Sequence, residues 1–275
     1  IAFFIQLSMM KSLASRHLKE RAKKFQSNHF SLFPAGWRLK KLRSIHSGKR
    51  CFIIGNGPSL RVEDLNALHH AGEITFAFNR IYHIFPDTLW RPTYYISQDM
   101  KMLSGCQEEV NNIHSSIKFI PAEMAWYYNI HLSGITAFHL KNEEENGLPT
   151  FSDDISKQII NSLTVVYSAI QIAAYMGIHE IYLIGVDHHF RTSMNADGQI
   201  IVDPTVKDYF CEQYNEDKDQ LYIPNTDKST LTFVAAKKHC DARGIRVYNA
   251  TRGGRLEVFP RANLDQILEG LCDEL

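Results

Sequence analysis

The segment 161–187 constrains the fold most strongly, because it predicts a helix, a stop and a buried strand in succession. Its first part carries apolar residues at helical spacing and stops at Gly177. The apolar run 180–184 (EIYLI) follows and ends in the polar tip 185–189 (GVDHH). A helix followed by such a strand is half of a βαβ unit. The chain is therefore expected to build an α/β fold.

Other short apolar runs predict further buried strands, because they lack the alternation of a half-exposed strand. These runs are 51–54, 73–78, 93–97, 117–120, 135–138 and 245–248, and helical patterns cover 61–70, 229–242 and 262–271. Two polar segments, 141–158 and 191–227, are expected to be loops. The second is long enough to be either functional, such as a lid, or partly disordered. We predict a doubly wound, mostly parallel Rossmann-like sheet over residues 49–275, after a basic helical arm over residues 1–48.

Ligands of open α/β sheets lie at the carboxyl ends of the strands, and three strand tips here have distinctive sequences. They are 55–59 (GNGPS), 185–189 (GVDHH) and 249–254 (NATRGG). Gly55 and Gly57 lack a Cβ, so their backbone amides could approach a phosphate closely. The tip 55–59 is neither a P-loop nor GxGxxG, and Asn79 stands where the latter motif has an acid about 20 residues on. It is either a phosphate-binding turn or a tight strand-to-helix turn without a ligand.

These tips also carry a family resemblance. FIIGNGPSL at 52–60, FAFNR at 76–80 and EIYLIGVD at 180–187 resemble the bacterial sialyltransferases that build lipooligosaccharide and capsule. They are equally similar to the MptE-like group, which includes an archaeal 6-hydroxymethylpterin diphosphokinase and the flagellin-modifying Maf proteins. The NATRGG tip is closer to this second group. The resemblance covers roughly residues 49–260 and leaves the basic arm unmatched.

The resemblance implies a cleft that binds a cytidine nucleotide. Asn56, Gly57 and Ser59 would face the phosphate and ribose of the donor, and Asn79 would help to hold the nucleotide. Thr164 matches a threonine at a helix start, although Val165-Val166 replaces the Ser-Gly that follows it in the sialyltransferases. Ser162 and Thr164 could also be helix caps alone. The expected substrate-binding residues are Gly55, Asn56, Gly57, Pro58, Ser59, Asn79, Asp99, Ser162, Thr164, Gly185, Asp187, Tyr222, Asn225 and Asn249.

The general base is the part of the resemblance that does not carry over. The sialyltransferases have a tyrosine that touches the leaving phosphate two residues after the aspartate of GVD, and that position here is His189. Their catalytic histidine aligns near Asn225, where this chain has no histidine. A hydroxyl acceptor needs a base within hydrogen-bonding reach, and the pKa of histidine suits the task. We therefore expect the base among His188, His189 and Asp227, with Asp99 as a further candidate.

The sequence predicts no metal site and no resident cofactor. The five cysteines are Cys51, Cys106, Cys211, Cys240 and Cys272, and without a CxxC pair they indicate neither zinc nor disulfides. Asp187 could bind Mg²⁺ together with a substrate phosphate, or hydrogen-bond a ribose or the backbone. A diphosphokinase would require the metal, whereas the sialyltransferase-like reading would not.

Charge divides the chain into a basic arm and an acidic body. Residues 1–50 contain twelve Lys or Arg and a single acid, giving +11, whereas the remainder carries −11. The segment 9–27 reads as a basic amphipathic helix, broken at Pro34-Ala35-Gly36 and followed by a second short helix over 37–46. An anionic membrane surface or a plain solvated face would explain this arm. The acidic body and the lack of a recognisable motif argue against nucleic acid.

The sequence predicts the cytoplasm as the compartment, because neither a disulfide framework nor a signal peptide is evident, with peripheral attachment to the inner face of the cell membrane through the arm. The apolar run 1–10 is about half of the ~20 residues that a membrane span needs. The leading hypothesis is a glycosyltransferase of bacterial surface-polysaccharide or glycoconjugate synthesis. It would transfer a nonulosonic acid-like sugar from a CMP-linked donor to a glycan acceptor. Attachment to the membrane would suit an acceptor that is lipid-linked. The alternatives are a Mg²⁺-dependent diphosphokinase acting on a pterin-like alcohol and a non-catalytic nucleotide-binding module; homo-oligomers are compatible with all three.

Overall fold

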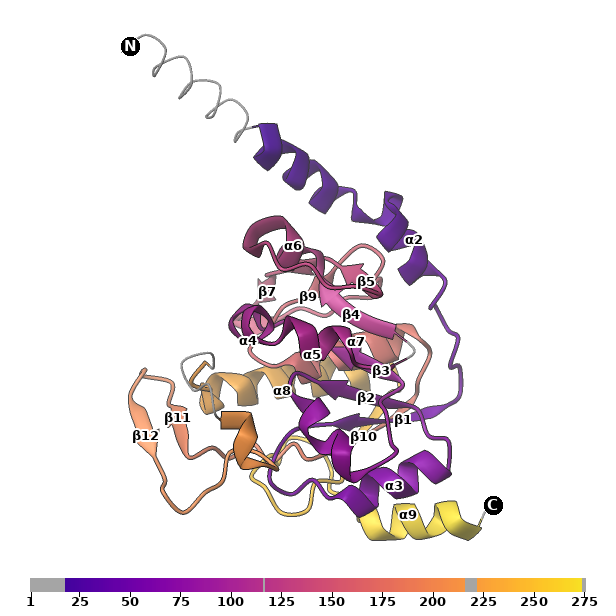
Figure 1. Ribbon diagram of the computed structural model, residues 1–275, viewed down its shortest axis with the longest axis vertical. Coiled ribbons are helices and arrows are strands. Elements are labelled where there is room, and N and C mark those ends of the chain that lie inside the picture. Colours follow the sequence, from indigo (N-terminus) through magenta and orange to yellow (C-terminus); the bar gives the residue numbers. More distant parts are fainter. Residues whose placement is uncertain (1–17, 116, 216–221, 274–275) are drawn as a thin grey trace.

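A parallel sheet of seven strands forms the centre of the protein (Figure 1). The computed structural model describes residues 18–115, 117–215 and 222–273. The sheet strands are β1 (Arg50–Ile54), β2 (Thr75–Phe78), β3 (Tyr94–Ile96), β4 (Ile117–Pro121), β5 (Ile135–Phe138), β10 (Glu180–Ile184) and β13 (Arg246–Asn249). Their order is β13-β10-β1-β2-β3-β4-β5, and every neighbouring pair is parallel. The predicted α/β Rossmann-like fold is confirmed.

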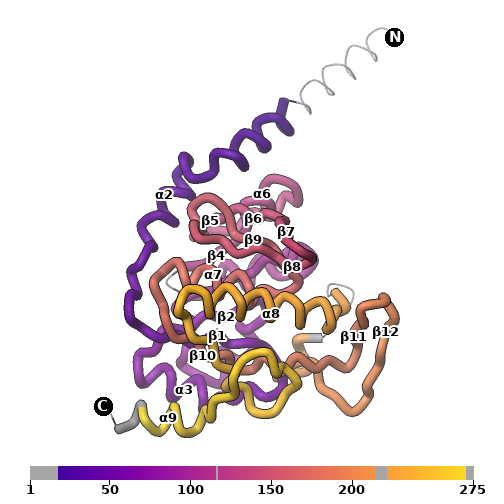
Figure 2. Tube along the Cα trace, turned by 180° about the vertical axis from the view of Figure 1, so that it is seen from behind, coloured from indigo at the N-terminus to yellow at the C-terminus, as the bar shows by residue number. Residues whose placement is uncertain are grey.

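Helices cover both faces of this sheet, so the fold has three layers (Figures 1 and 2). One face carries α3 (Val62–His70), α4 (Met100–Gly105), α5 (Gln107–Asn111) and α9 (Leu264–Asp273). The other carries α2 (Pro34–Lys40), α7 (Val165–Tyr175) and α8 (Thr226–Asp241). A further helix, α6 (Ala122–Tyr128), follows β4 near the β5 edge. There are also a helix over residues 18–28 of the arm and 3-10 turns at Phe30–Leu32, Ile81–Asp87 and Glu212–Asn215.

The apolar runs form strands because both of their faces are buried. In β1, Cys51 and Ile53 pack into the core under α7 and α8, whereas Phe52 and Ile54 pack into the core under α3 and α9. This period of two is that of a strand, and it fills a core on each side of the sheet. All of the predicted sheet strands are present, and their boundaries agree with the sequence within two residues.

The direction in which successive strands are added to the sheet reverses between β1 and β10, and this reversal determines where a ligand can bind. From β1 the chain runs outward through β2, β3, β4 and β5, then returns to place β10 on the opposite side of β1. The carboxyl ends of β1 and β10 therefore diverge into connections on opposite sides. In doubly wound folds the crevice at such a switch point is the usual ligand site.

The two segments expected to be loops contain small strands. Within 141–158 the structure has β7 (Glu144–Glu145) paired with β8 (Leu148–Pro149), while β6 (Leu140–Lys141) pairs with β9 (Ile159–Ile160). Within 191–227 a hairpin of β11 (Thr192–Met194) and β12 (Ile200–Val202) projects from the body (Figure 1). The short helices α4, α5 and α6 were not expected, because five to seven residues are too few for a clear helical period.

The arm differs from the expectation in the bounds of its helices: the second helix ends at Lys40, and residues 41–46 form turns instead of continuing the helix predicted over 37–46. Residues 18–28 are helical, and the rest of the predicted 9–27 helix lies outside the described residues. The break falls at 29–33, and Pro34 then starts α2 instead of separating two helices. Proline is favoured in the first turn of a helix, where its missing N–H costs nothing. None of the helices that the structure describes reaches the length and apolarity of a bilayer-crossing segment.

Candidate functional site

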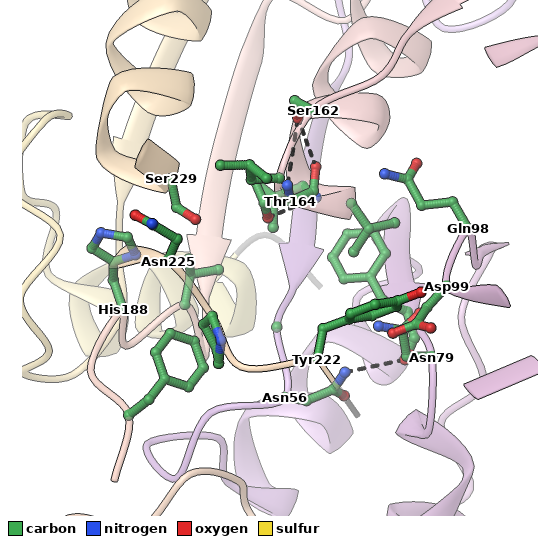
Figure 3. A pocket seen from close by; sticks show the side chains of 18 of the residues that line it. Asn56, Asn79, Gln98, Asp99, Ser162, Thr164, His188, Tyr222, Asn225 and Ser229 are labelled. Carbon is green, nitrogen blue, oxygen red and sulfur yellow. Dashed lines mark hydrogen bonds between the residues drawn. The ribbon is translucent and has the colours of Figure 1, made fainter. Parts of the chain in front are cut away.

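A cavity of about 780 Å³ opens at the carboxyl ends of the strands, over the switch point (Figure 3). Thirteen of the expected site residues line it: Gly55, Asn56, Gly57, Asn79, Asp99, Ser162, Thr164, Gly185, Asp187, His188, His189, Tyr222 and Asn225. Four expected residues, Pro58, Ser59, Asp227 and Asn249, are not part of its lining. Its volume lies within the usual range for small-molecule sites, roughly 300–1,000 Å³.

Both glycines of the GNGPS turn serve strand packing. The N–H of Gly55 donates to the carbonyl of Ile184 at 2.7 Å, and that of Gly57 donates to the carbonyl of Gly185 at 2.9 Å. A Cβ on Gly55 would lie 2.2 Å from the Gly185 oxygen. The expectation that these two amides approach a phosphate is therefore corrected: both are bonded to the tip of β10.

Asp187 holds the same turn from the other side. Its Oδ2 accepts a hydrogen bond from the Ser59 hydroxyl at 2.8 Å, and the Ser59 N–H donates to the carboxylate as well. Burial raises the pKa of Asp187, and the bonds from Ser59 oppose that rise. Of the two roles left open for Asp187, the structure shows hydrogen bonding to the turn. Among the described residues, no three His, Cys, Asp or Glu side chains are grouped so that they could hold a metal ion.

Asn56 lines the cavity, and its side chain contains a buried acceptor without a partner. Its Nδ2 donates to the carbonyl of Phe78 and to the hydroxyl of Tyr214, both at 3.2 Å, and the Phe78 carbonyl fixes the orientation of the amide. Its Oδ1 is buried without a hydrogen-bond partner. A buried acceptor of this kind costs about 1–3 kcal/mol when it stays unpaired. A ligand with a hydroxyl or amino donor would satisfy it, whereas a phosphate would not.

Asn79 ends β2 in a left-handed backbone conformation, with φ of 49°. Its Oδ1 accepts from the Ser97 hydroxyl at 2.9 Å, and its carbonyl accepts from the Tyr95 hydroxyl at 2.8 Å. Asparagine tolerates this conformation better than most residues. The tip of β3 thus fixes Asn79, which faces the cavity beside Asn56 (Figure 3).

The N-terminus of α7 forms another wall. Thr164 is its N-cap, with Oγ1 accepting from the N–H of Val166 at 3.3 Å. The Ser162 hydroxyl donates to the carbonyl of Thr164 at 3.2 Å. Thr164 is therefore the cap, whereas the Ser162 hydroxyl bonds to the backbone of Thr164, and both residues line the cavity. The positive end of this helix dipole favours an anion at the cavity.

Asp99 and Tyr222 lie together on the side of the cavity that also holds Asn56 and Asn79 (Figure 3). Asp99 caps α4 by accepting from the N–H of Met102 at 3.1 Å, and burial raises its pKa. The ammonium of Lys101 lies 4.4 Å from the centre of the Tyr222 ring. A carboxyl with a raised pKa in a cavity is a candidate for proton transfer.

His188 lies on the opposite side, with Asn225 and Ser229 (Figure 3). Its Nε2 is 2.7 Å from the Thr230 hydroxyl, which donates its own proton to the carbonyl of Thr226 at 2.9 Å. With the Thr230 proton on the Thr226 carbonyl, Thr230 accepts from His188, and in this tautomer Nε2 carries the ring proton and Nδ1 is the basic nitrogen. Burial lowers the pKa of His188 and keeps the ring neutral near pH 7.

The other two base candidates have different surroundings. His189 lines the cavity with its Nε2 3.5 Å from a carboxylate oxygen of Asp203. Asp227 is exposed and accepts from the N–H of Ala196 at 2.8 Å, so it holds the turn after β11. Asn225 caps α8 by accepting from the N–H of Lys228 at 2.9 Å, which explains why asparagine stands where the sialyltransferase histidine was sought.

Asn249 is a structural residue of the third tip. It is fully buried, its Nδ2 donates to the carbonyl of Leu256 at 2.7 Å, and its Oδ1 accepts from the N–H of Thr251 at 3.0 Å. Each polar atom of the side chain is thus engaged within its own loop. This placement leaves no atom of the Asn249 amide for a substrate.

A tyrosine-rich part of 191–227 covers the GNGPS turn, and sequence reasoning missed its role. The N–H of Phe210 donates to the carbonyl of Asn56 at 3.0 Å. The rings of Tyr209 and Tyr214 stack at 3.8 Å, and both line the cavity. The tyrosines within a polar segment were the only available signal that this segment contributes to the site, and their spacing has neither a helical nor a strand period.

The far end of the cavity is built beyond β4. Glu123, Met124 and Tyr128 of α6 line it, with Leu140 and Asn142 from the segment after β5. Three strand spacings of about 4.8 Å separate β1 from β4, so this end lies roughly 14 Å from the GNGPS turn. The described lining includes four carboxylates, Asp99, Glu123, Asp187 and Asp208, but no Lys or Arg.

One solved structure supports this fold, and a second is reported beside it. A Maf glycosyltransferase from Magnetospirillum magneticum AMB-1 is 12% identical with a TM-score of 0.50, and the match covers 84% of this chain but only 38% of that longer protein. The sialyltransferase CstII from Campylobacter jejuni, solved in complex with a substrate analogue, cytidine-5'-monophosphate, is 14% identical with a TM-score of 0.43. That match covers 79% of this chain and 86% of CstII.

A comparison with curated protein sequences finds no match. A family model does match, and it extends from residue 24 within the arm helix to residue 193 in β11. This range includes the GNGPS turn, α7 and the tip of β10, and it holds most of the residues that line the cavity. Because the model for MptE-like proteins, described as 6-hydroxymethylpterin diphosphokinase MptE-like, covers more than half of the sequence, this chain belongs to the MptE-like family.

Proposed function

We propose that the protein is a glycosyltransferase of bacterial surface-polysaccharide or glycoconjugate synthesis that uses a CMP-linked sugar, nonulosonic acid-like, as its donor. One observation carries the proposal: the described lining of the switch-point cavity offers amide and hydroxyl side chains, that of Asn56 with its unpaired Oδ1 among them, beside apolar residues and carboxylates, and it has no Lys or Arg. Such a wall suits the hydroxyls and amino group of a nucleoside and a sugar. The glycosyltransferase named above shares this fold, which agrees with the proposal.

The charge of the wall favours a donor with a single phosphate. Tri- and diphosphates are usually held by a P-loop, by Lys or Arg, or by a metal ion that carboxylates bind. Here the described lining has no Lys or Arg, and no three of its carboxylates are grouped so that they could hold a metal ion, so the N-terminus of α7 is what attracts a phosphate. One helix N-terminus attracts one phosphate group, so a nucleoside monophosphate sugar fits this cavity better than ATP.

The proposed assignment of roles follows from the atoms that are still available. Asn56 Oδ1 accepts from a donor group of the nucleoside, and the N-terminal turn of α7, capped by Thr164, faces the phosphate. The acceptor glycan enters at the far end, beside Glu123 and Tyr128, and extends along the cavity to the donor sugar, so that its reacting hydroxyl lies next to His188. The two substrates then share a cavity that extends over four strands of the sheet.

His188 is the proposed general base. An acceptor hydroxyl oxygen forms a bond to the anomeric carbon of the donor sugar, while the bond from that carbon to the phosphate oxygen breaks and CMP leaves. Nδ1 of His188 takes the hydroxyl proton, because Nε2 already holds one for Thr230. Burial keeps the ring neutral and therefore able to accept a proton. Asp99 is the second candidate for this role, since it also lines the cavity and also has a perturbed pKa.

The alternative function is the activity in the family description, diphosphate transfer from a nucleoside triphosphate to a pterin. It requires binding of a triphosphate with Mg²⁺, which makes the two functions separable by their ligands. Thermal stabilisation by CMP without a metal ion supports the glycosyltransferase, and stabilisation by ATP only with Mg²⁺ supports the diphosphokinase.

The decisive experiment combines calorimetric binding of CMP with a matched pair of variants. Asn56→Ala removes the unpaired acceptor, and Asn112→Ala removes an exposed asparagine that lies outside the cavity. We expect Asn56→Ala to weaken CMP binding about tenfold, corresponding to one hydrogen bond of about 1.4 kcal/mol, and Asn112→Ala to leave it unchanged. Equal affinities in the wild type and both variants would rule out the donor site.

A further inference from the structure

The basic arm is attached to the body at one end of the cavity. Its helix, residues 18–28, is held by the ammonium of Lys23, which donates to the carbonyl of Trp126 and lies 4.4 Å from the centre of the Tyr127 ring. Four residues later, Ser27 shares a hydrogen bond of 2.8 Å with Nε2 of His139. Lys23 and Ser27 therefore define the face of this helix that touches α6 and the end of β5.

A chain of hydrogen bonds continues from the arm to the cavity wall. Nδ1 of His139 lies 2.5 Å from a carboxylate oxygen of Glu123, and the second Glu123 oxygen accepts from the N–H of Leu140 at 3.3 Å. Glu123 and Leu140 both line the far end of the cavity. Two side-chain hydrogen bonds thus separate the arm from the place that the proposed function gives to the acceptor.

The opposite face of the arm helix is apolar and exposed. Leu18 and Phe25 are seven residues apart and so share one face, and they are 69% and 59% exposed. Trp37 on α2 is 59% exposed, and Leu32 between the two helices is exposed as well. The views in Figures 1 and 2 show residues 18–40 lying along the outside of the molecule, above α6 and β5.

Cations surround these apolar side chains. Between residues 18 and 48 the chain has eight Lys or Arg and one acid, Glu20. Five of the cations are Arg21, Lys24, Arg38, Lys40 and Lys41, and none of these forms an ion pair with another residue that the structure describes. Apolar and aromatic side chains among unpaired cations are what binding to an anionic bilayer requires.

We propose that this outer surface, defined by Leu18, Arg21, Phe25, Trp37 and Lys40, docks on an anionic bilayer and that the acceptor is a lipid-linked glycan. The inference about the acceptor rests on the proposed function, whereas the docking does not. Docking brings the Glu123 end of the cavity toward the membrane through the contacts of Ser27 and His139. An acceptor anchored in the bilayer then reaches the cavity without leaving the membrane.

Co-sedimentation of the full chain with vesicles tests the docking, with phosphatidylcholine vesicles that contain increasing fractions of phosphatidylglycerol. Binding should rise with phosphatidylglycerol and fall with salt. Removing one engaged cation should weaken partitioning about fivefold, so the pair Arg21→Gln and Lys40→Gln should weaken it roughly 25-fold. The matched control pair, Lys228→Gln and Lys238→Gln, removes two exposed cations of α8 and should leave partitioning unchanged.

The rival occupant of the surface is the acidic body of a second copy of the chain. Light scattering of the same proteins separates the two cases: an oligomer that the arm variants dissociate, without vesicle binding, overturns the proposal. Equal loss of partitioning in the control pair overturns it too. CMP binding, measured without vesicles, reports on the proposed function alone. Vesicle binding through the arm without CMP binding would support the docking and refute the proposed function. CMP binding without vesicle binding would refute the docking and leave the proposed function standing.

Activity measurements with two acceptors test the lipid-linked substrate. With a lipid-linked acceptor in anionic vesicles, the arm variants should lose about the same factor in kcat/KM as in partitioning. With the corresponding soluble glycan they should keep wild-type kcat/KM. Equal losses with both acceptors would show that the arm supports the cavity structurally, and would refute the inference.

Discussion

Replacing Gly57 by alanine tests whether the GNGPS turn is a strand-packing device. The new Cβ would lie 1.8 Å from Oδ2 of Asp187 and 2.8 Å from the carbonyl oxygen of Gly185. Carbon and oxygen do not approach within 3.0 Å, so the carboxylate must move by about 1.2 Å or more. The hydrogen bond from the Ser59 hydroxyl, now 2.8 Å long, cannot survive such a movement.

The cost follows from what Asp187 loses. A hydrogen bond to a charged group contributes about 1.5–3 kcal/mol, and the carboxylate accepts two from Ser59. Allowing for partial relaxation, we expect Gly57→Ala to lower the free energy of unfolding by about 3 kcal/mol. In a protein of this size that corresponds to a fall of roughly 6 °C in Tm. Thermal unfolding followed by circular dichroism measures it directly.

Two further variants make the test specific. Gly270→Ala changes a glycine of α9 that has open space around it, so it should raise stability by up to about 1 kcal/mol. In an Asp187→Ala background the main clash is absent, and Gly57→Ala should cost much less there than in the wild type. A wild-type Tm for Gly57→Ala, or the same cost in both backgrounds, would refute the packing argument.

Four other perturbations have expected outcomes. Burial lowers the pKa of His188 in the folded protein, so the stability that the neutral ring contributes is present above pH 6.5 and is lost as the pH falls through the folded-state pKa. Asparagine tolerates the φ of 51°, so His188→Asn should keep the fold. It should make the free energy of urea unfolding less dependent on pH below pH 6.5. Thr230→Val should keep the fold but change the pH profile of kcat, because the His188 tautomer is no longer fixed. Arg252→Ala removes the partner of Asp64, which is 3% exposed in its side chain, and should cost about 3–5 kcal/mol in urea unfolding. Gln171→Leu leaves the N–H groups of Ser152 and Ile160 and the carbonyl of Ile160 without their partner, and should lower the free energy of unfolding by about 3 kcal/mol, again measured with urea.

The central sheet could be predicted because its strands are buried on both faces. Runs such as 51–54 and 180–184 are short, apolar and bounded by polar tips, which is the pattern of a strand buried on both faces. The pairing of β10 beside β1 was not available from the pattern. It depends on contacts between residues more than 120 positions apart, which the chain makes only when the whole sheet is assembled.

The candidate site was predicted unevenly, for physical reasons. Most predicted residues line one cavity, because the carboxyl ends of parallel strands meet at one edge of the sheet. The role of each residue depended on its hydrogen bonds, which spacing does not encode. Ser59 donates its hydrogen bond to Asp187, and Asn249 holds the 249–256 loop. Glu123 and Tyr209 were missed because they stand outside any motif and reach the cavity only through the tertiary fold.

The tip of β10 connects the two halves of the proposed reaction. Asp187 fastens the turn that carries Asn56, and the next residue, His188, is fastened through Thr230 to α8. His188 adopts a left-handed conformation, with φ of 51°, which costs energy for a residue that is not glycine. Such strain persists where the surroundings fix the residue on both sides, and here they do. One dipeptide therefore sets the position of the proposed base relative to the nucleotide side of the cavity, so the two sides of the cavity cannot shift independently at this point.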